Sequence, residues 1–229
     1  MLTTVWSVKG GVGVSVVSAA LAVVRARATG SSLLVDLAGD QPALLGLPEP
    51  SGPGVWDWLE SDAGTARTLE RLVVAVAPDL DLLPAGRGWD VPPARRAALV
   101  DALAGAGRSV VVDAGILRPS AGEAGPVADG GPCRVALGRA LAAAGRSLLV
   151  TRPCYLALRR AAREEVRADA VVLVVDPGRA LDRRDVAQVL GLPVAAVLEV
   201  DPAVARSVDA GTLVTRLPRS VERALRGVS

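Results

Sequence analysis

The fold is decided by the stretch from Val5 to Val17, which reads VWSVKGGVGVSVV. An apolar run typical of a strand enters it, three glycines form a tight turn, and a helix of small residues leaves it. This is the layout of a phosphate-binding loop, in which successive backbone N–H groups and a helix N-terminus converge on an anion. Glycines are needed there because a Cβ would block the positive-φ turns and the close approach of phosphate oxygens.

One position departs from the usual pattern of such a loop, G-x-x-x-x-G-K-[ST]. Ser15 falls on the hydroxyl that binds Mg²⁺, but the residue before it, which should be lysine, is Val14. A lysine there carries positive charge to the β- and γ-phosphates, which binds the nucleotide and neutralises charge as the γ-phosphoryl group leaves. Val14 can do neither, so the sequence predicts weak binding and weak hydrolysis.

The segment from Lys9 to Ser15, KGGVGVS, closely resembles the deviant P-loop of the MinD/ParA family, K-G-G-x-G-K-[ST]. That family carries an early lysine, which reaches the partner's phosphates in the ATP-bound dimer. Lys9 matches the early lysine and is the only lysine in the chain, so a chance lysine on a degenerate loop is the disfavoured alternative. The resemblance implies nucleotide binding by Lys9, Gly10, Gly11, Val12, Gly13, Val14, Ser15 and Val16.

Length and composition suit one domain. The 229 residues are expected to form a single nucleotide-binding domain over residues 1–229, with a core of Leu, Val and Ala because aromatics are 2% of the chain and Phe is absent. No apolar run reaches the roughly 18 residues that span a bilayer. The start lacks a secretory signal, so we expect a cytoplasmic location, with peripheral membrane contact as an alternative. Cys133 and Cys154 have neither metal-site spacing nor a disulfide framework.

Apolar runs that suit buried strands alternate with helical segments. After a helix at 14–28, the predicted strands are 32–36, 72–77, 80–84, 109–113, 147–151, 170–176 and 193–199. The predicted helices are 41–47, 54–61, 92–106, 133–144, 155–167 and 182–190, with two more from 202 and 218. Residues 115–131, rich in Gly and Pro, are predicted to form a mobile surface loop. The alternation predicts an α/β fold with a mostly parallel central sheet flanked by helices on both faces.

Further stretches carry the MinD/ParA resemblance in order along the chain. Residues 33–41, LLVDLAGDQ, are similar to the family's second strand, and 110–115, VVVDAG, to its Walker B strand. Residues 149–153 and 191–204 resemble two later segments. The set implies a P-loop NTPase-like fold, and the short chain with its degraded loop is similar to the TadZ/CpaE branch.

The resemblance also implies a metal site and a base contact. Asp36 and Asp113 end two predicted strands, where parallel sheets bind ligands, and with Ser15 they form the expected Mg²⁺ site; the alternative is that both only cap loops. Asp176 stands where the family commonly has an adenine-reading Asn, so it is the expected base contact together with Pro177. An aspartate accepts hydrogen bonds but does not donate them, which leaves base selectivity open.

A second departure affects hydrolysis. In MinD/ParA the second aspartate of V-D-x-D positions the attacking water, and here that position is Ala38. The resemblance therefore implies a positioning or assembly protein of chromosome partitioning, septum-site or pilus systems, which binds ATP or ADP with Mg²⁺ weakly and has lost hydrolysis. One alternative is an active Mg-ATPase that dimerises on ATP, with Lys9 as the candidate catalytic residue. Another is a nucleotide-free structural partner of an active paralogue.

The implied partners are a second copy or a related ATPase, together with a protein of the positioning or pilus system. DNA contact through Arg159, Arg160, Arg163 and Arg167 is disfavoured, because acidic residues interrupt the basic run and the net charge is only +2. A stripe of apolar residues ends the chain: Leu217, Val221, Ala224, Leu225 and Val228. We expect it to pack on the sheet rather than bind membrane, because it holds only two leucines and no aromatic residue.

Overall fold

The computed structural model describes residues 1–62, 64–88, 91–117 and 131–228. The strands are β1 (Leu2–Ser7), β2 (Ser32–Asp36), β3 (Val74–Ala77), β4 (Leu80–Leu83), β5 (Ser109–Ile116), β6 (Arg146–Thr151), β7 (Ala170–Val175) and β8 (Val194–Glu199). The longer helices are α1 (Val14–Thr29), α5 (Pro93–Ala104), α6 (Gly131–Ala144), α8 (Arg183–Leu190) and α9 (Pro202–Asp209). The shorter ones are α2 (Gln41–Leu44), α3 (Val55–Glu60), α4 (Ala66–Glu70), α7 (Tyr155–Ala161) and α10 (Arg219–Leu225).

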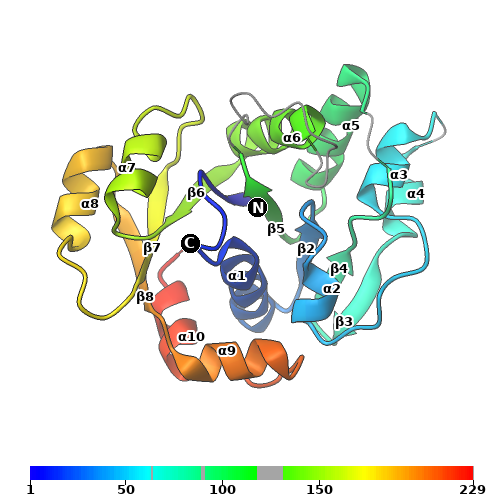
Figure 1. Ribbon diagram of the computed structural model, residues 1–229. Coiled ribbons are helices and arrows are strands. Elements are labelled where there is room, and N and C mark those ends of the chain that lie inside the picture. The colour runs from blue at the N-terminus through cyan, green and yellow to red at the C-terminus, as the bar shows by residue number, and fades with distance from the viewer. Residues whose placement is uncertain (63, 89–90, 118–130, 229) are drawn as a thin grey trace.

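The strands form one sheet in the order β3-β4-β2-β5-β1-β6-β7-β8, which confirms the predicted α/β fold. Neighbouring strands are parallel except at one edge, where β3 runs antiparallel to β4. The strand β1 lies in the middle, with β5 on one side and β6 on the other (Figure 1). The strand order changes direction at this point, and a sheet of this kind leaves a crevice there at the carboxyl ends of its strands.

Helices cover both faces of the sheet (Figure 1). On one face α1 lies against β2 and β5, and α10 lies against α1 and β8. On the other face α6 packs on β1, β5 and β6 beside α5. The sheet carries apolar residues on both sides, so each face has its own core: Val17, Leu21, Leu34 and Val111 belong to the first, and Trp6, Leu99, Val112 and Leu137 to the second.

Three local predictions differ from the structure. The helix predicted at 155–167 is wrong in extent, because α7 ends at Ala161 and the chain then turns so that the Glu164 carboxylate binds Arg139 of α6. The four arginines from 159 to 167 therefore do not share one helical face. Helix α4 was not predicted; it begins after Thr65, whose hydroxyl accepts a hydrogen bond from the Thr68 N–H. A loop was predicted at 115–131. Its first two residues belong to β5, its last residue begins α6, and residues 118–130 lie outside the described residues.

Four of the five residues of the apolar stripe at the end of the chain are buried, and Ala224 is partly buried. Leu225 is 1% exposed and Val221 6%, and α10 lies against α1 and β8. Arg27 of α1 also pairs with Glu222 of α10 at 3.1 Å between Nη1 and Oε2. The stripe packs on the sheet as predicted. Within the described ranges, no helix is long and apolar enough to cross a membrane.

Replacing Leu225 by Ala should lower the free energy of unfolding by about 2–5 kcal/mol, because it removes a fully buried side chain and leaves a cavity between α10 and α1. The measurement is chemical denaturation followed by circular dichroism. The matched control is Arg223→Ala on the exposed side of the same helix, which should change stability by less than about 0.5 kcal/mol. Equal stabilities of the two variants would contradict the packing of α10.

Candidate functional site

The loop between β1 and α1 has the geometry of an anion cradle. Gly11 and Gly13 have φ values of 71° and 93°, in the left-handed region that favours glycine. A Cβ on either residue would meet no atom within 4 Å, so both face open space. Helix α1 begins after Gly13 without a side-chain cap, which leaves the N–H groups of its first turn available to a ligand.

A cavity of about 680 Å³ lies over this loop, within the size range of ligand sites in proteins. All of the predicted nucleotide-binding residues, 9–16, line it. The remaining lining comes from elements distant in the sequence: Ser7, Ala38, Asp40, Ala43, Leu44, Gly115, Ile116, Arg134, Val208 and Asp209. The residues predicted to form one binding loop therefore line one cavity, which lies at the carboxyl end of β1.

Lys9 and Val14 have different environments within the cavity. Lys9 is half-buried and, within the part of the chain that the structure describes, its ammonium group makes no ion pair. Val14 is only 7% exposed and belongs to the apolar core around α1. The position that usually carries a lysine is thus part of the core, and the one lysine of the loop stays accessible to a ligand.

Asp36 is fully buried at the end of β2, and its carboxylate is occupied by the backbone. Oδ1 accepts hydrogen bonds from the N–H groups of Ala38 and Gly39 at 2.9 and 2.7 Å, and Oδ2 accepts one from Gln41 at 3.0 Å. Burial is the largest cause that raises the pKa of Asp36, to about 7, and the charge of Asp113 adds to it. Asp36 thereby shapes the turn that places Ala38 and Gln41.

Asp113 lies beside Asp36, because the two are partners in the register between β2 and β5. Its Oδ2 accepts a hydrogen bond from Gln41 Nε2 at 2.7 Å, its Oδ1 accepts one from the Gly115 N–H at 3.1 Å, and the Ser15 hydroxyl also donates to it. Burial raises the pKa of Asp113 despite these bonds. The structure therefore brings Ser15 and Asp113 together, and a hydroxyl with a carboxylate is a ligand set that suits Mg²⁺.

Gln41 is a site residue that the sequence did not reveal. Its Nε2 donates both to Asp113 and to the Ser15 carbonyl at 3.0 Å, so it joins the end of β2 to the start of α1. Its Oε1 is buried and has no hydrogen-bond partner among the described residues. Gln41 and Asp113 are 72 positions apart, so no local pattern links them.

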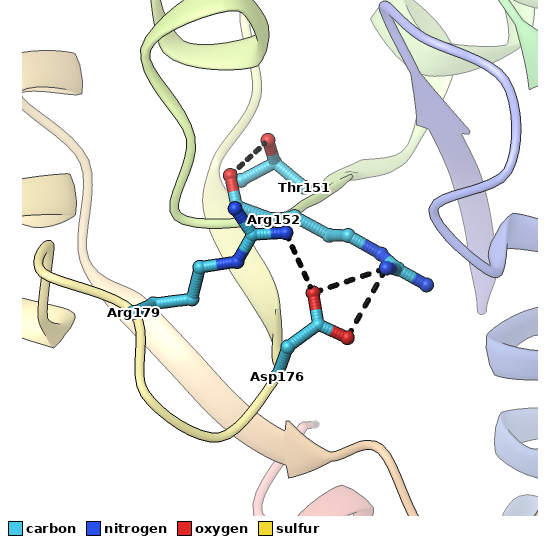
Figure 2. A network of polar contacts seen from close by, with 4 residues as sticks. All are labelled: Thr151, Arg152, Asp176 and Arg179. Carbon is cyan, nitrogen blue, oxygen red and sulfur yellow. Dashed lines mark hydrogen bonds and ion pairs between the residues drawn. The ribbon is translucent and has the colours of Figure 1, made fainter.

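The expected base contact lies elsewhere. Figure 2 shows Arg152 and Arg179 converging on the carboxylate of Asp176, with Nη–Oδ distances of 3.1 to 3.2 Å. Neither Asp176 nor Pro177 is among the residues that line the loop cavity. A base at Asp176 would meet two guanidinium groups there, so a base contact of Asp176 and Pro177 stays a prediction.

Comparison with solved structures identifies the architecture. The MinD cell division protein of Aquifex aeolicus superposes with a TM-score of 0.75 at 18% identity, over 99% of this chain and 94% of that one. A ParA family ATPase of Chlorobium tepidum gives 0.73 at 19% identity, over 98% and 96%. The chain has the fold of the MinD and ParA proteins. A third neighbour with this fold is MinD of Pyrococcus horikoshii, complexed with Mg-ADP, at 0.71 and 18% identity over 99% and 93%.

These identities are low enough that the MinD and ParA likeness shows the fold alone. A scan of protein-family models and a search of curated proteins both found no match.

The raised pKa values of Asp36 and Asp113 predict a pH effect on stability. The folded protein keeps protons on these carboxyls that the unfolded chain loses near 3.8. The contribution of Asp36 to stability therefore falls as pH rises from about 4 to about 7, and the contribution of Asp113 changes in the same direction. Asp113→Asn removes one titrating group and the repulsion on Asp36. The free energy of unfolding of this variant, measured by urea titration, should rise relative to the parent across that range by up to about 1.4 kcal/mol per pH unit for each proton.

The control for this pH experiment is Asp101→Asn, an exposed aspartate of α5. Its curve should run parallel to that of the parent. If the Asp113→Asn curve is also parallel to the parent, then the buried carboxyls do not titrate in this range.

Proposed function

We propose that this chain binds ATP or ADP with Mg²⁺ weakly in the loop cavity, hydrolyses little or none of it, and acts as a positioning or assembly factor. The observation that carries the proposal is that the open glycine cradle and the uncapped start of α1 are retained, while the lysine position is the buried Val14. The backbone amides around Gly11 and Gly13 would take the phosphates. This is a deviant Walker A loop without its second lysine.

The metal would be held by the Ser15 hydroxyl, with Asp113 behind it. Bound Mg²⁺ supplies charge neutralisation of the phosphates and orients them. Asp36 would act on this site through the turn that it shapes, and Gln41 through its hydrogen bonds to Asp113 and the Ser15 carbonyl. Asp176 and Pro177 remain the proposed base contacts, with Arg152 and Arg179 beside them.

Hydrolysis lacks two separate contributions. Val14 removes the cation that stabilises the leaving γ-phosphoryl group, and Ala38, on the cavity wall, has no carboxylate to position water. Losses of this kind cost about 10²-fold or more each. The alternative is an active ATPase in which Lys9 supplies the cation. The position of Lys9 in the lining of the cavity supports this alternative.

The cellular role is proposed from the fold. The neighbours include MinD, ParA and a plasmid partition protein of Borrelia burgdorferi, and one is a MinC:MinD complex of Aquifex aeolicus. We therefore propose a cytoplasmic protein that pairs with a second copy or with a related ATPase, and binds a protein of a partitioning, septum-site or pilus system. Within the MinD/ParA family, we propose that the chain belongs to the TadZ/CpaE branch. DNA and membrane contact are not favoured, because the basic run does not form one helical face and the terminal stripe is buried.

Nucleotide binding should depend on Gly13. Gly13→Val strains a left-handed backbone position and places a side chain in the cradle, so the affinity for Mg-ATP, measured by calorimetric titration, should be lost. The control is Gly30→Val at the other end of α1, with φ of 73° and equally open surroundings, which carries the same backbone strain away from the cavity. Gly30→Val should keep the affinity. A parent without measurable affinity would favour the nucleotide-free structural partner.

ATP turnover by the parent, measured as phosphate release, should not exceed the background. Val14→Lys should improve the affinity for ATP more than the turnover, because Ala38 still leaves the water unplaced. Adding Ala38→Asp to Val14→Lys should then raise turnover by roughly 10²-fold. Steady turnover in the parent that Lys9→Ala abolishes would overturn the proposal in favour of an active ATPase.

A further inference from the structure

A second cavity lies at the amino ends of β1, β2 and β5, at the opposite end of these strands from the loop cavity. Its volume is about 460 Å³, within the size range of ligand sites in proteins. The last turn of α1, the start of β5 and the end of α10 contribute to its wall. The lining includes Arg25, Arg108 and Arg226, and among the described residues that line it none is acidic.

Arg25, on α1, is the buried member of this set, with 8% of its surface exposed. Its Nη1 donates to the Thr3 hydroxyl at 2.8 Å and its Nη2 to the Val228 carbonyl at 3.4 Å, so both partners are neutral. No carboxylate of the described residues forms an ion pair with it. Burial, with the like charge of Arg146 as a smaller cause, lowers the pKa of Arg25 to about 10. The fold therefore buries a cation without an opposite charge beside it, which is costly.

The other two arginines of the cavity have acidic partners that lie outside its lining. Arg108 binds Asp81, and Arg226 binds Glu222. The remaining wall is partly apolar, because Val24, Ala28 and Leu225 also line the cavity. The lining thus combines cations with apolar surface, which suits an anion that carries an uncharged organic group.

We propose that this cavity binds a small phosphate monoester, with its phosphate on Arg25 and its organic group against Val24, Ala28 and Leu225. A guanidinium group offers several donors in a planar fork that matches phosphate oxygens. A phosphate monoester carries more negative charge than a carboxylate at neutral pH, and the cavity offers more than one cation. The two cavities share no lining residue, so this site is independent of the proposed function.

The test is calorimetric titration of phenyl phosphate into the parent, Arg25→Gln and Arg25→Lys. Arg25→Gln should weaken binding by roughly tenfold or more, as expected for hydrogen bonds to a charged group. Arg25→Lys keeps the charge but not the fork, so it should lose less affinity. The control is Arg223→Gln on α10, which removes a charge outside the cavity and should keep the affinity. A parent that does not bind, or unchanged affinity in Arg25→Gln, would overturn the inference.

A second variant and a melting experiment separate ligand binding from a purely structural role of Arg25. Arg226→Gln changes an exposed residue of the lining and should weaken binding by roughly two- to fivefold without lowering the melting temperature. Phenyl phosphate should raise the melting temperature of the parent but not that of Arg25→Gln, because it stabilises only the folded form that binds it. A structural role predicts the same melting difference between these two proteins with and without phenyl phosphate, and that result would overturn the inference.

Two further titrations test the place and the chemistry of this site. Gly13→Val should keep the affinity for phenyl phosphate, because Gly13 lines the loop cavity and not this one. Loss of binding in Gly13→Val would place the anion in the loop cavity and overturn the inference. Benzoate, which carries a carboxylate on the same ring, should bind the parent more weakly than phenyl phosphate. Equal or tighter binding of benzoate would overturn the assignment of a phosphate.

Discussion

The site depends on the hydrogen bonds that tie Asp36, Gln41 and Asp113 together at the carboxyl ends of β2 and β5. Asp36 holds the turn after β2, the turn places Gln41, and Gln41 reaches both Asp113 and the start of α1. Burial of these two carboxylates is costly and is the largest cause that raises the pKa of each; for Asp36 the charge of Asp113 adds to it.

Two residues that line the loop cavity, Val14 and Ala38, differ from the usual pattern of such a loop. Val14, at the position of the usual lysine, belongs to the apolar core around α1, and the methyl group of Ala38 lies close to Gly115 at the end of β5. Among the described residues that line the cavity, the cations are Lys9 and Arg134, which come from distant parts of the sequence. Under the proposed function the glycine loop binds the phosphates, whereas turnover would also require a positioned water.

Much of the fold could be predicted because its signals are local. The apolar runs at 32–36 and 109–113 suit strands buried on both faces, and the glycines at 11 and 13 suit a turn with positive φ. The sequence-based prediction of a helix was wrong where a tertiary contact overrides the local helical pattern. Helix α7 stops at Ala161 although the sequence continues in a helical pattern, and Glu164 instead meets Arg139 of a different helix. Helix α4 is only five residues long and is defined by a Thr65–Thr68 cap, too short for periodicity to reveal.

The sequence by itself determined the strand–loop–helix unit at the start of the chain, the alternation that builds the sheet, and the two departures at Val14 and Ala38. These follow from neighbouring residues, whose backbone preferences and spacing act over a few positions. Only the tertiary structure decided that Gln41 joins Asp113 to α1, that Asp176 is held by two arginines, and that Arg134 lies on the cavity wall. Each of these contacts depends on which strands become neighbours, and the packing of the whole sheet determines that.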